Sequence, residues 1–265
     1  MTGGPAVLLT SAQESTTRQL LVAAAADRGL AHAVQGGAEH AALPGRAVHW
    51  YGGPLAARRL DRALGLALLE PSDAWLAELP AEFTGRRIEL TTLCEARAAR
   101  RPVFVKPPSD KQFPAAVYQD GSRLPRGGER IAPDTPVLVS EVVTFAVEYR
   151  LFVLDGRIAA GSRYARYGRL DVAPLDADPA AAGVRFFAAE LLAAVADTLP
   201  SGVVVDVGLL QDPDRGSERW AVVEANMPWF AHSYAADMAG VLDVVLRSAG
   251  PRQLVGAADR RFVRE

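Results

Sequence analysis

Apolar and polar positions follow different patterns in two regions of the chain. In the first region, apolar runs at Ala6–Thr10 and Ala47–Tyr51 predict strands, and longer helical patterns at Ser11–Arg28 and Leu55–Leu69 predict helices. A strand–helix–strand–helix order is typical of a parallel α/β unit. We therefore predict a small N-terminal α/β domain over residues 1–100.

From Pro102 the pattern becomes mainly β. Apolar runs predict strands at Val103–Lys106, Ala115–Tyr118, Val137–Val143, Glu148–Leu154 and Arg157–Arg163. Asp155-Gly156 separates the last two, and such a pair is a strong signal for a two-residue hairpin turn. Helical patterns near residues 179–199 and 233–248 follow. Residues 101–265 are predicted to form one α+β domain rich in antiparallel sheet.

The stretch 203–230, VVVDVGLLQDPDRGSERWAVVEANMPWF, predicts a β-hairpin that carries two acids. Asp206 and Glu224 are equidistant from Arg215 in the turn, so we expect them to face each other. Alternation along the strand places Asn226 on the same face as Glu224. Facing acids destabilise a sheet, and a Mg²⁺ ion would offset this because it accepts Asp, Glu and Asn oxygens. The alternative is a solvated hairpin with ordinary surface acids.

Charged residues on the earlier strands suit a phosphorylated ligand. Lys106 ends a strand before two prolines, where a compact cation suits a phosphate, and Lys111 lies in the loop PPSDKQFP that follows. Glu148 and Arg150 are two apart, so they share a face of their strand. Arg163 is expected near Arg150 across the Asp155-Gly156 hairpin. Each position also has an ordinary interpretation as a surface charge.

Aromatic residues and histidines near these positions leave two interpretations open. Tyr164 and Tyr167 lie in a predicted loop and either clamp a substrate or are partly buried there. His232 and Tyr234 follow Asn226 closely and either line an acceptor pocket or pack locally. The four histidines lack the spacing of zinc ligands.

Composition narrows the class of protein. The 265 residues are 49% hydrophobic and 23% charged, as in an ordinary globular protein. With 29 basic and 31 acidic residues, the net charge of −2 gives no support for nucleic-acid binding. No run is long enough for a membrane helix, so we expect no membrane partner. The single Cys94, in a helix predicted at about residues 88–99, excludes an internal disulfide and is expected to be buried. We expect a cytoplasmic protein.

An ordered set of positions resembles the ATP-grasp superfamily: Lys106-Pro107, Glu141, Glu148, Asp206 and Glu224-x-Asn226. The chain is particularly similar to a bacterial subclade named for one arginine and two lysines, whose members have a strand like Glu148-Tyr149-Arg150. The similarity covers about residues 100–248. It implies an ATP-grasp fold after the N-terminal α/β domain.

The resemblance also implies how ATP is held. Lys106 would contact the α- and β-phosphates, and Glu148 would hold the ribose. The adenine would be held by Glu141 and the backbone at Val142, Val143 and Thr144.

The resemblance further implies the metal ligands and catalytic groups. Mg²⁺ would be ligated by Asp206, Glu224 and Asn226. Arg150 and Arg163 would point toward the γ-phosphate. One departure concerns the loop after Lys106, because PPSDKQFP has no glycine where the family has a glycine-rich loop. We hypothesise that Lys111 supplies a side-chain charge there.

The activity implied by the resemblance is an ATP- and Mg²⁺-dependent carboxylate–amine ligase that acts through an acyl phosphate. Its substrates would be small-molecule or peptide carboxylates and amines, and a homodimer is compatible with the sequence. Three alternatives stay open: a phosphotransferase of the same fold, a non-catalytic ATP-binding protein, and an interaction domain that binds no nucleotide.

Overall fold

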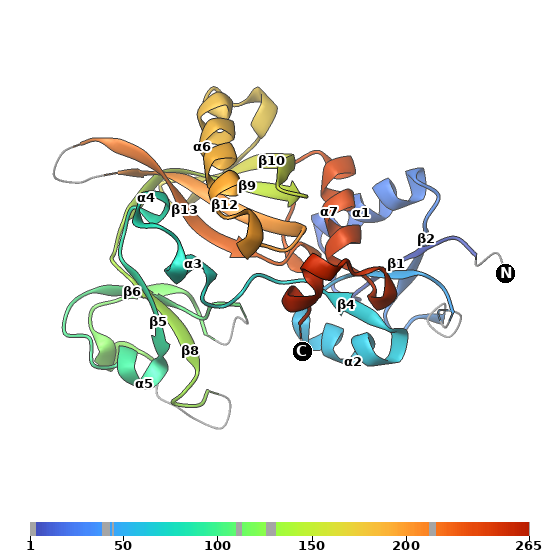
Figure 1. Cartoon of the computed structure of the whole chain (residues 1–265), viewed down its shortest axis with the longest axis horizontal. Coiled ribbons are helices and arrows are strands. Elements are labelled where there is room, and N and C mark those ends of the chain that lie inside the picture. Colours follow the sequence, from blue (N-terminus) through green and yellow to red (C-terminus); the bar gives the residue numbers. More distant parts are fainter. Residues whose placement is uncertain are drawn as a thin grey trace.

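The computed structural model describes residues 4–38, 43, 45–109, 113–125, 131–211 and 216–264, without the side chains of residues 58, 59, 61 and 62. Three bodies of structure lie in a row (Figure 1). The N-terminal α/β unit is at one end, a four-stranded sheet is at the other, and a five-stranded sheet lies between them. This mixture of a parallel α/β unit with antiparallel sheets confirms the predicted fold class.

The N-terminal unit is a parallel sheet of order β2-β1-β3 with helices against it. Its elements are β1 (Val7–Thr10), α1 (Thr16–Asp27), β2 (Ala31–Val34), β3 (Val48–Tyr51), α2 (Pro54–Leu64) and β4 (Leu66–Leu68). Strand β2 was not predicted. The helix predicted to run to Leu69 ends at Leu64, because Gly65 has a left-handed φ of 63°. Leu55, whose spacing suggested a core position, is 84% exposed.

The four-stranded antiparallel sheet has the order β5-β8-β6-β7. Its strands and the adjoining helices are α3 (Trp75–Glu78), α4 (Ala81–Thr84), β5 (Ile88–Thr92), α5 (Leu93–Ala96), β6 (Val103–Lys106), β7 (Ala116–Tyr118) and β8 (Pro136–Ser140). The helix predicted at about residues 88–99 is wrong for its first half, which is β5. Thr92 and Glu95 form a capping box that starts the one-turn helix α5. Cys94 points outward from that turn and is exposed, contrary to expectation.

The five-stranded antiparallel sheet has the order β11-β10-β9-β12-β13. Its elements are β9 (Thr144–Leu154), β10 (Arg157–Arg166), β11 (Arg169–Pro174), α6 (Ala181–Ala194), β12 (Gly202–Gln211) and β13 (Glu218–Asn226). Asp155 and Gly156 both have positive φ, which confirms the predicted hairpin turn. Helix α7 (Met238–Ser248) and β14 (Ala249–Pro251) follow. The 3-10 helices are Gly121–Arg123, Leu175–Ala177, Ala196–Thr198, Pro228–Phe230, Arg252–Leu254 and Ala257–Phe262.

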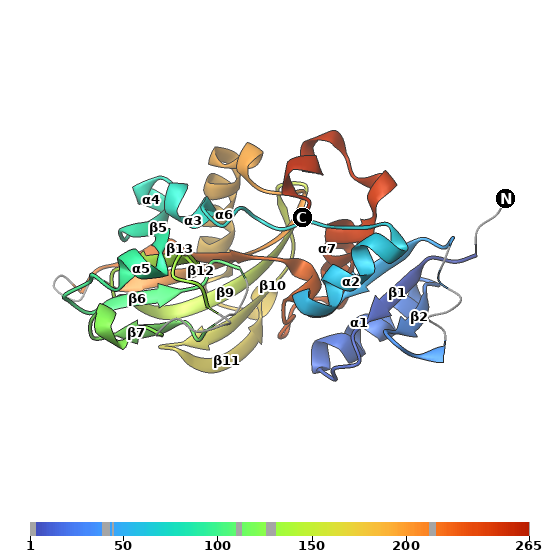
Figure 2. The same ribbon diagram turned by 90° about the horizontal axis from the view of Figure 1, so that it is seen from below.

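Alternation along the central strands divides the large sheet into two faces. One face packs against α6 through odd-numbered residues of β9 and β12, among them Tyr149, Leu151 and Val205. The even-numbered residues face the other way, and Phe152 and Val204 there join a core with α7. Glu148, Arg150 and Asp206 therefore lie on the face away from α6. Figure 2 shows the strands of the smaller sheet beside this region of the large sheet.

Strand pairings cross the domain boundary expected at residue 100. Strand β5 pairs with β8, and β14 near the C-terminus pairs with β4. We therefore propose a boundary near residues 70–74, with the C-terminal segment returning to the first domain. Among the described residues, no helix is both long and apolar enough to cross a membrane.

Candidate functional site

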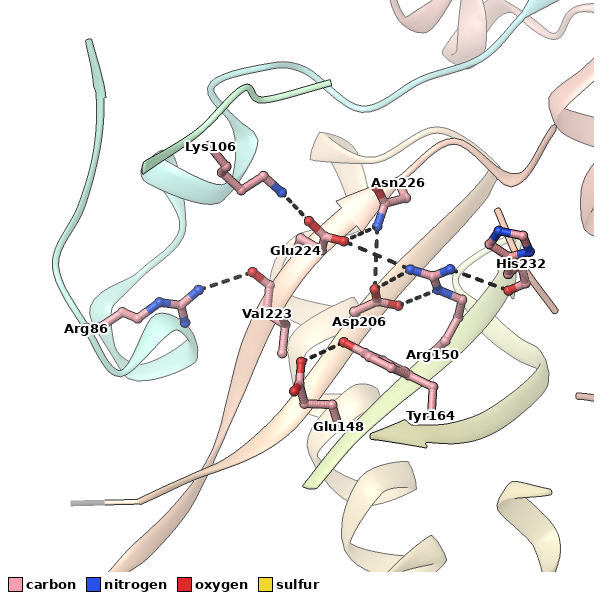
Figure 3. Close-up of polar contacts among 10 residues, drawn as sticks. All are labelled: Arg86, Lys106, Glu148, Arg150, Tyr164, Asp206, Val223, Glu224, Asn226 and His232. Atoms are coloured by element: carbon pink, nitrogen blue, oxygen red, sulfur yellow. Dashed lines mark hydrogen bonds and ion pairs between the residues drawn. The ribbon is translucent and has the colours of Figure 1, made fainter. Parts of the chain in front are cut away.

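One row of side chains crosses the large sheet on the face away from α6. Asp206 on β12 lies opposite Arg150 on β9 and also opposite Glu224 on β13, so three charged residues stand side by side. Asn226 follows on β13, and Lys106 reaches the row from the end of β6 in the smaller sheet (Figure 3). The structure thus brings these five predicted residues together. The predicted opposition of Asp206 and Glu224 is confirmed.

Arg150 and Asp206 form a bidentate ion pair. The Arg150 Nε and Nη2 atoms donate to the two Asp206 oxygens at 2.9 and 2.7 Å. Burial raises the pKa of Asp206 to about 6, and the Arg150 charge opposes a further rise. Burial alone would lower the pKa of Arg150, but the Asp206 charge holds it above its ordinary value. Both groups are therefore charged at neutral pH.

Lys106, Glu224 and Asn226 form the second part of the row. Lys106 Nζ donates to Glu224 Oε2, and Asn226 Nδ2 donates to Glu224 Oε1 at 2.7 Å. Burial alone would raise the pKa of Glu224, but the Lys106 charge, its hydrogen bond and that from Asn226 bring it to about 2. Glu224 is therefore a firmly ionised carboxylate with cations on two sides, since Arg150 Nη2 is 3.9 Å from Oε1.

Glu148 lies on the same face as Arg150, as alternation predicted. Its Oε2 atom accepts a hydrogen bond of 2.7 Å from the Tyr164 hydroxyl. Burial raises the pKa of Glu148, and this hydrogen bond limits the rise. Tyr164 lies in β10 instead of the loop that the sequence predicted.

A cavity of about 390 Å³ brings together the residues predicted to hold adenine and ribose. It is lined by Lys106, Glu141, Val142, Val143, Thr144, Glu148 and Glu224, with Arg86, Phe104 and Phe145 among its other walls. Glu141 is fixed because its carboxylate accepts from the Arg87 backbone N–H at 3.0 Å. The backbone between β8 and β9 thus faces a cavity with Lys106 and Glu148 at its sides.

A second cavity of about 600 Å³ shares Lys106, Ala115 and Glu224 with the first. Its polar wall includes Arg150, Asn226 and His232, and its apolar wall includes prolines, Phe113, Met227 and Phe230. The Lys106–Glu224 pair therefore stands at the junction of two cavities.

Arg163 lies on the other face of the sheet, so the expectation that it neighbours Arg150 is wrong. Ser162 is the residue opposite Arg150, and Arg163 is opposite Tyr149. Its guanidinium pairs with Asp178 and with Asp171, at 3.1 Å for the second. The side chain of Asp178 is fully buried and also accepts from the Tyr149 hydroxyl at 2.8 Å. Arg163 therefore closes a structural network beside α6.

Replacing Arg163 by glutamine is expected to lower stability without weakening ATP binding. The substitution leaves the buried Asp178 charge without its main cation, which costs about 3 kcal/mol. Urea denaturation measures this loss, and calorimetric titration with Mg²⁺·ATP should give an affinity within about twofold of the unmodified chain. An affinity at least tenfold weaker would instead support the role that the resemblance implied.

Lys111 lies outside the described residues. Sequence reasoning missed Arg86, whose guanidinium lies 5.3 Å from the centre of the Phe145 ring in the first cavity. Arg86 donates to the backbone oxygens of Val222 and Val223 at 2.7 and 3.1 Å, and burial lowers its pKa to about 10. Val223 is the extra residue of a β-bulge, because Asp206 pairs with Glu224 and Val207 with Val222. No sequence pattern signalled that an arginine would hold this bulge.

The predicted metal ligands fit a divalent cation in chemistry and only partly in placement. Glu224 and Asn226 line the second cavity and offer oxygen atoms. Asp206 is fully buried with both oxygens on Arg150, so its coordination would require a shift of that pair. Among the described residues, no three His, Cys, Asp or Glu side chains gather as a metal site. Any site here would combine two carboxylates with the Asn226 amide.

Comparison with known proteins identifies the family. The model that matches describes the ATP-grasp domain of the clade named for one arginine and two lysines, family 2. It covers residues 83–244, which is more than half of the chain. The chain therefore belongs to this family of ATP-grasp proteins, as its resemblance implied. A comparison with curated proteins found no match.

Solved structures share the fold at low sequence identity. The macrocyclase MdnC of Microcystis aeruginosa, bound with precursor peptide MdnA, is 13% identical with a TM-score of 0.51, covering 92% of this chain and 99% of its own. D-alanine–D-alanine ligase of Bacillus anthracis is 11% identical with a TM-score of 0.49, covering 92% and 97%. A RimK-domain ATP-grasp protein of Sphaerobacter thermophilus is 17% identical with a TM-score of 0.43, covering 91% and 97%. At these identities the likeness shows the ATP-grasp fold alone.

Proposed function

We propose that this protein is an ATP- and Mg²⁺-dependent ligase that joins a carboxylate to an amine through an acyl phosphate. The observation that carries the proposal is the Lys106–Glu224 pair at the junction of the two cavities. The 390 Å³ cavity would take the adenine and ribose, and the 600 Å³ cavity the acceptor. The γ-phosphate would then lie beside Lys106 and Arg150.

The residues of the row would act by position and charge. An oxygen of the acceptor carboxylate attacks the γ-phosphorus, and ADP leaves with the bond electrons. The amine nitrogen then attacks the acyl carbon, loses a proton and displaces phosphate. Lys106 and Arg150 would stabilise charge on the transferred group, while Glu148 would orient the ribose. Mg²⁺ at Glu224 and Asn226 would supply further charge neutralisation when bound.

Acceptor chemistry is proposed only as a class. The apolar walls of the second cavity suit the body of a small molecule or peptide, and Arg150 and His232 at its polar side suit a carboxylate. The MdnC structure holds a precursor peptide, so peptides with acidic side chains belong among the acceptors to be tested.

A hydroxylamine trap tests the reaction class. We expect the protein with Mg²⁺·ATP, an accepted carboxylate and hydroxylamine to release ADP and a hydroxamate, because hydroxylamine acts as a small amine toward acyl phosphates. Mass spectrometry detects the hydroxamate, and a coupled assay measures ADP. Omitting the carboxylate is the control and should stop both.

Other outcomes separate the alternatives. A phosphorylated product that resists hydroxylamine would indicate a phosphotransferase. Stabilisation by Mg²⁺·ATP in a thermal melt without ADP release would indicate a non-catalytic binding protein. The absence of any thermal shift would contradict nucleotide binding altogether.

A further inference from the structure

Two stacked tyrosines lie against the Arg150 guanidinium. The rings of Tyr164 and Tyr234 have centroids 5.2 Å apart and planes within 13° of each other. The guanidinium carbon of Arg150 lies 5.6 and 5.3 Å from these two centroids, within the range of cation–π attraction. Burial raises the pKa of both phenols, so both are neutral in the physiological range. Arg150 is thus held by two aromatic rings as well as by Asp206.

Tyr164 links Arg150 to Glu148. Its ring contacts the guanidinium, and its hydroxyl donates to Glu148 Oε2 at 2.7 Å (Figure 3). Neither Tyr164 nor Tyr234 lines the two cavities at the Lys106–Glu224 pair. Both tyrosines would therefore act on a substrate only through the residues that they contact.

Tyr234 is fixed in an unusual backbone conformation. Its φ of 51° lies in the left-handed region, which is disfavoured for a bulky residue and persists only where the surroundings impose it. Both neighbours are tied down. The Ser233 N–H donates to Thr17 Oγ1 on α1 at 3.0 Å, and the Ala235 N–H donates to Ser162 Oγ on β10 at 3.2 Å.

The Thr17 contact joins the two domains at this point. Thr17 belongs to the N-terminal unit, and its hydroxyl also lies 3.2 Å from that of Ser233, with both residues buried. Arg150 Nη1 donates to the backbone oxygen of His232 at 3.4 Å, in the same segment. The segment that carries Tyr234 therefore contacts the N-terminal domain on one side and Arg150 on the other.

We propose that Tyr164 and Tyr234 are positioning residues for Arg150, and that Thr17 makes this positioning depend on the docked N-terminal domain. The proposal rests on the proposed function, in which Arg150 stabilises the transferred phosphoryl group. Tyr164 holds Arg150 and Glu148 in one arrangement, and Tyr234 fixes the guanidinium from the interdomain side. The docking of the N-terminal domain thereby sets the geometry of a residue on the central sheet.

Tyrosine substitutions test the proposal by separating kcat from KM. Tyr234→Leu removes the ring and is expected to lower kcat about tenfold, with the Kd of Mg²⁺·ATP changed less than about threefold. Tyr234→Phe keeps the ring and should keep kcat within about threefold. Tyr164→Phe removes the hydrogen bond to Glu148 and should raise the KM for ATP about fivefold or more.

A matched control and a domain-contact variant complete the series. Tyr149→Phe removes the hydroxyl of a buried tyrosine next to Arg150 on the opposite face, where it donates to Asp178. It should lower the melting temperature and leave kcat within about twofold. Thr17→Val removes the hydroxyl at the domain contact and should lower kcat about fivefold. Equal losses in Tyr234→Phe and Tyr234→Leu, or kcat losses that follow melting temperature in every variant, would overturn the proposal.

A spectroscopic readout separates this proposal from the proposed ligase activity. The Arg150 Nε–H signal, assigned by its loss in Arg150→Lys, should be slow to exchange and shifted by the two aromatic rings. Tyr234→Leu should move the signal toward an ordinary arginine position, and Thr17→Val should move it in the same direction. An unmoved signal would overturn the positioning role even in an active enzyme. A moved signal in a protein that never releases ADP would support the positioning and contradict the ligase.

Discussion

A Glu224→Gln protein is expected to lose most of the Mg²⁺-dependent part of its ATP affinity and to bind metal-free ATP more tightly than the unmodified chain. The substitution keeps the shape of the side chain and removes one negative charge beside Lys106. Without metal, this charge repels the phosphates and competes for the lysine. With metal, it is a ligand. We expect each effect to be about tenfold in Kd and the loss of turnover to be about a hundredfold.

Calorimetric titration with ATP in Mg²⁺ and in EDTA measures both effects. Glu218→Gln is a matched control, because Glu218 lies on the same strand, is exposed and contacts Gln211 at the far end of the hairpin. It should leave both affinities unchanged. If Glu224→Gln keeps the unmodified ratio of affinities with and without metal, the metal does not bind at this hairpin.

The site could be predicted wherever simple alternation holds. Glu148 and Arg150 share a face because no irregularity separates them on β9. The opposition of Asp206 and Glu224 followed from the symmetry of the hairpin about its turn, and the structure has that pairing. These positions depend on local rules, and short-range spacing is sufficient to apply them.

The errors arise where one extra residue changes the register. A hairpin turn at Asp155-Gly156 without irregularity would place Arg163 opposite Glu148, on the same face as Arg150. The β-bulge between Ile158 and Ala160 shifts the pairing, so Arg163 faces Asp178 instead. Bulges of this kind depend on packing between distant segments. The sequence carries no short-range signal for them.

Arg86 and the Tyr164–Tyr234 pair were unpredictable for a related reason. Arg86 holds the carbonyls of a bulge more than a hundred residues away along the chain, as the sequence separation of 136 to Val222 shows. Tyr164 and Tyr234 come from different elements, and their stacking requires the last segment to cross between the domains. Contacts of this range follow from the completed fold. Strand periodicity alone does not reveal them.

Arg150→Lys is expected to abolish nearly all turnover while keeping the positive charge. Lysine cannot supply the two parallel hydrogen bonds that Arg150 gives to Asp206, nor the flat surface that lies against Tyr164 and Tyr234. Loss of a preorganised donor at a developing charge costs about a hundredfold to a thousandfold in kcat. Urea denaturation should also show a loss of about 2 kcal/mol, because the buried Asp206 keeps only part of its hydrogen bonding. Arg247→Lys, in an exposed ion pair with Asp155, should change neither quantity.

The double substitution Arg150→Met with Asp206→Leu separates folding from catalysis at this pair. Arg150→Met alone leaves a fully buried carboxylate without its cation and should be the less stable protein, by about 3 kcal/mol relative to the unmodified chain. Replacing both charges by apolar side chains removes that penalty, so the double variant should regain most of the stability and none of the turnover. Denaturation and ADP release, measured on the same preparations, give the two quantities. Recovery of activity together with stability would mean that the Arg150–Asp206 pair serves the fold alone.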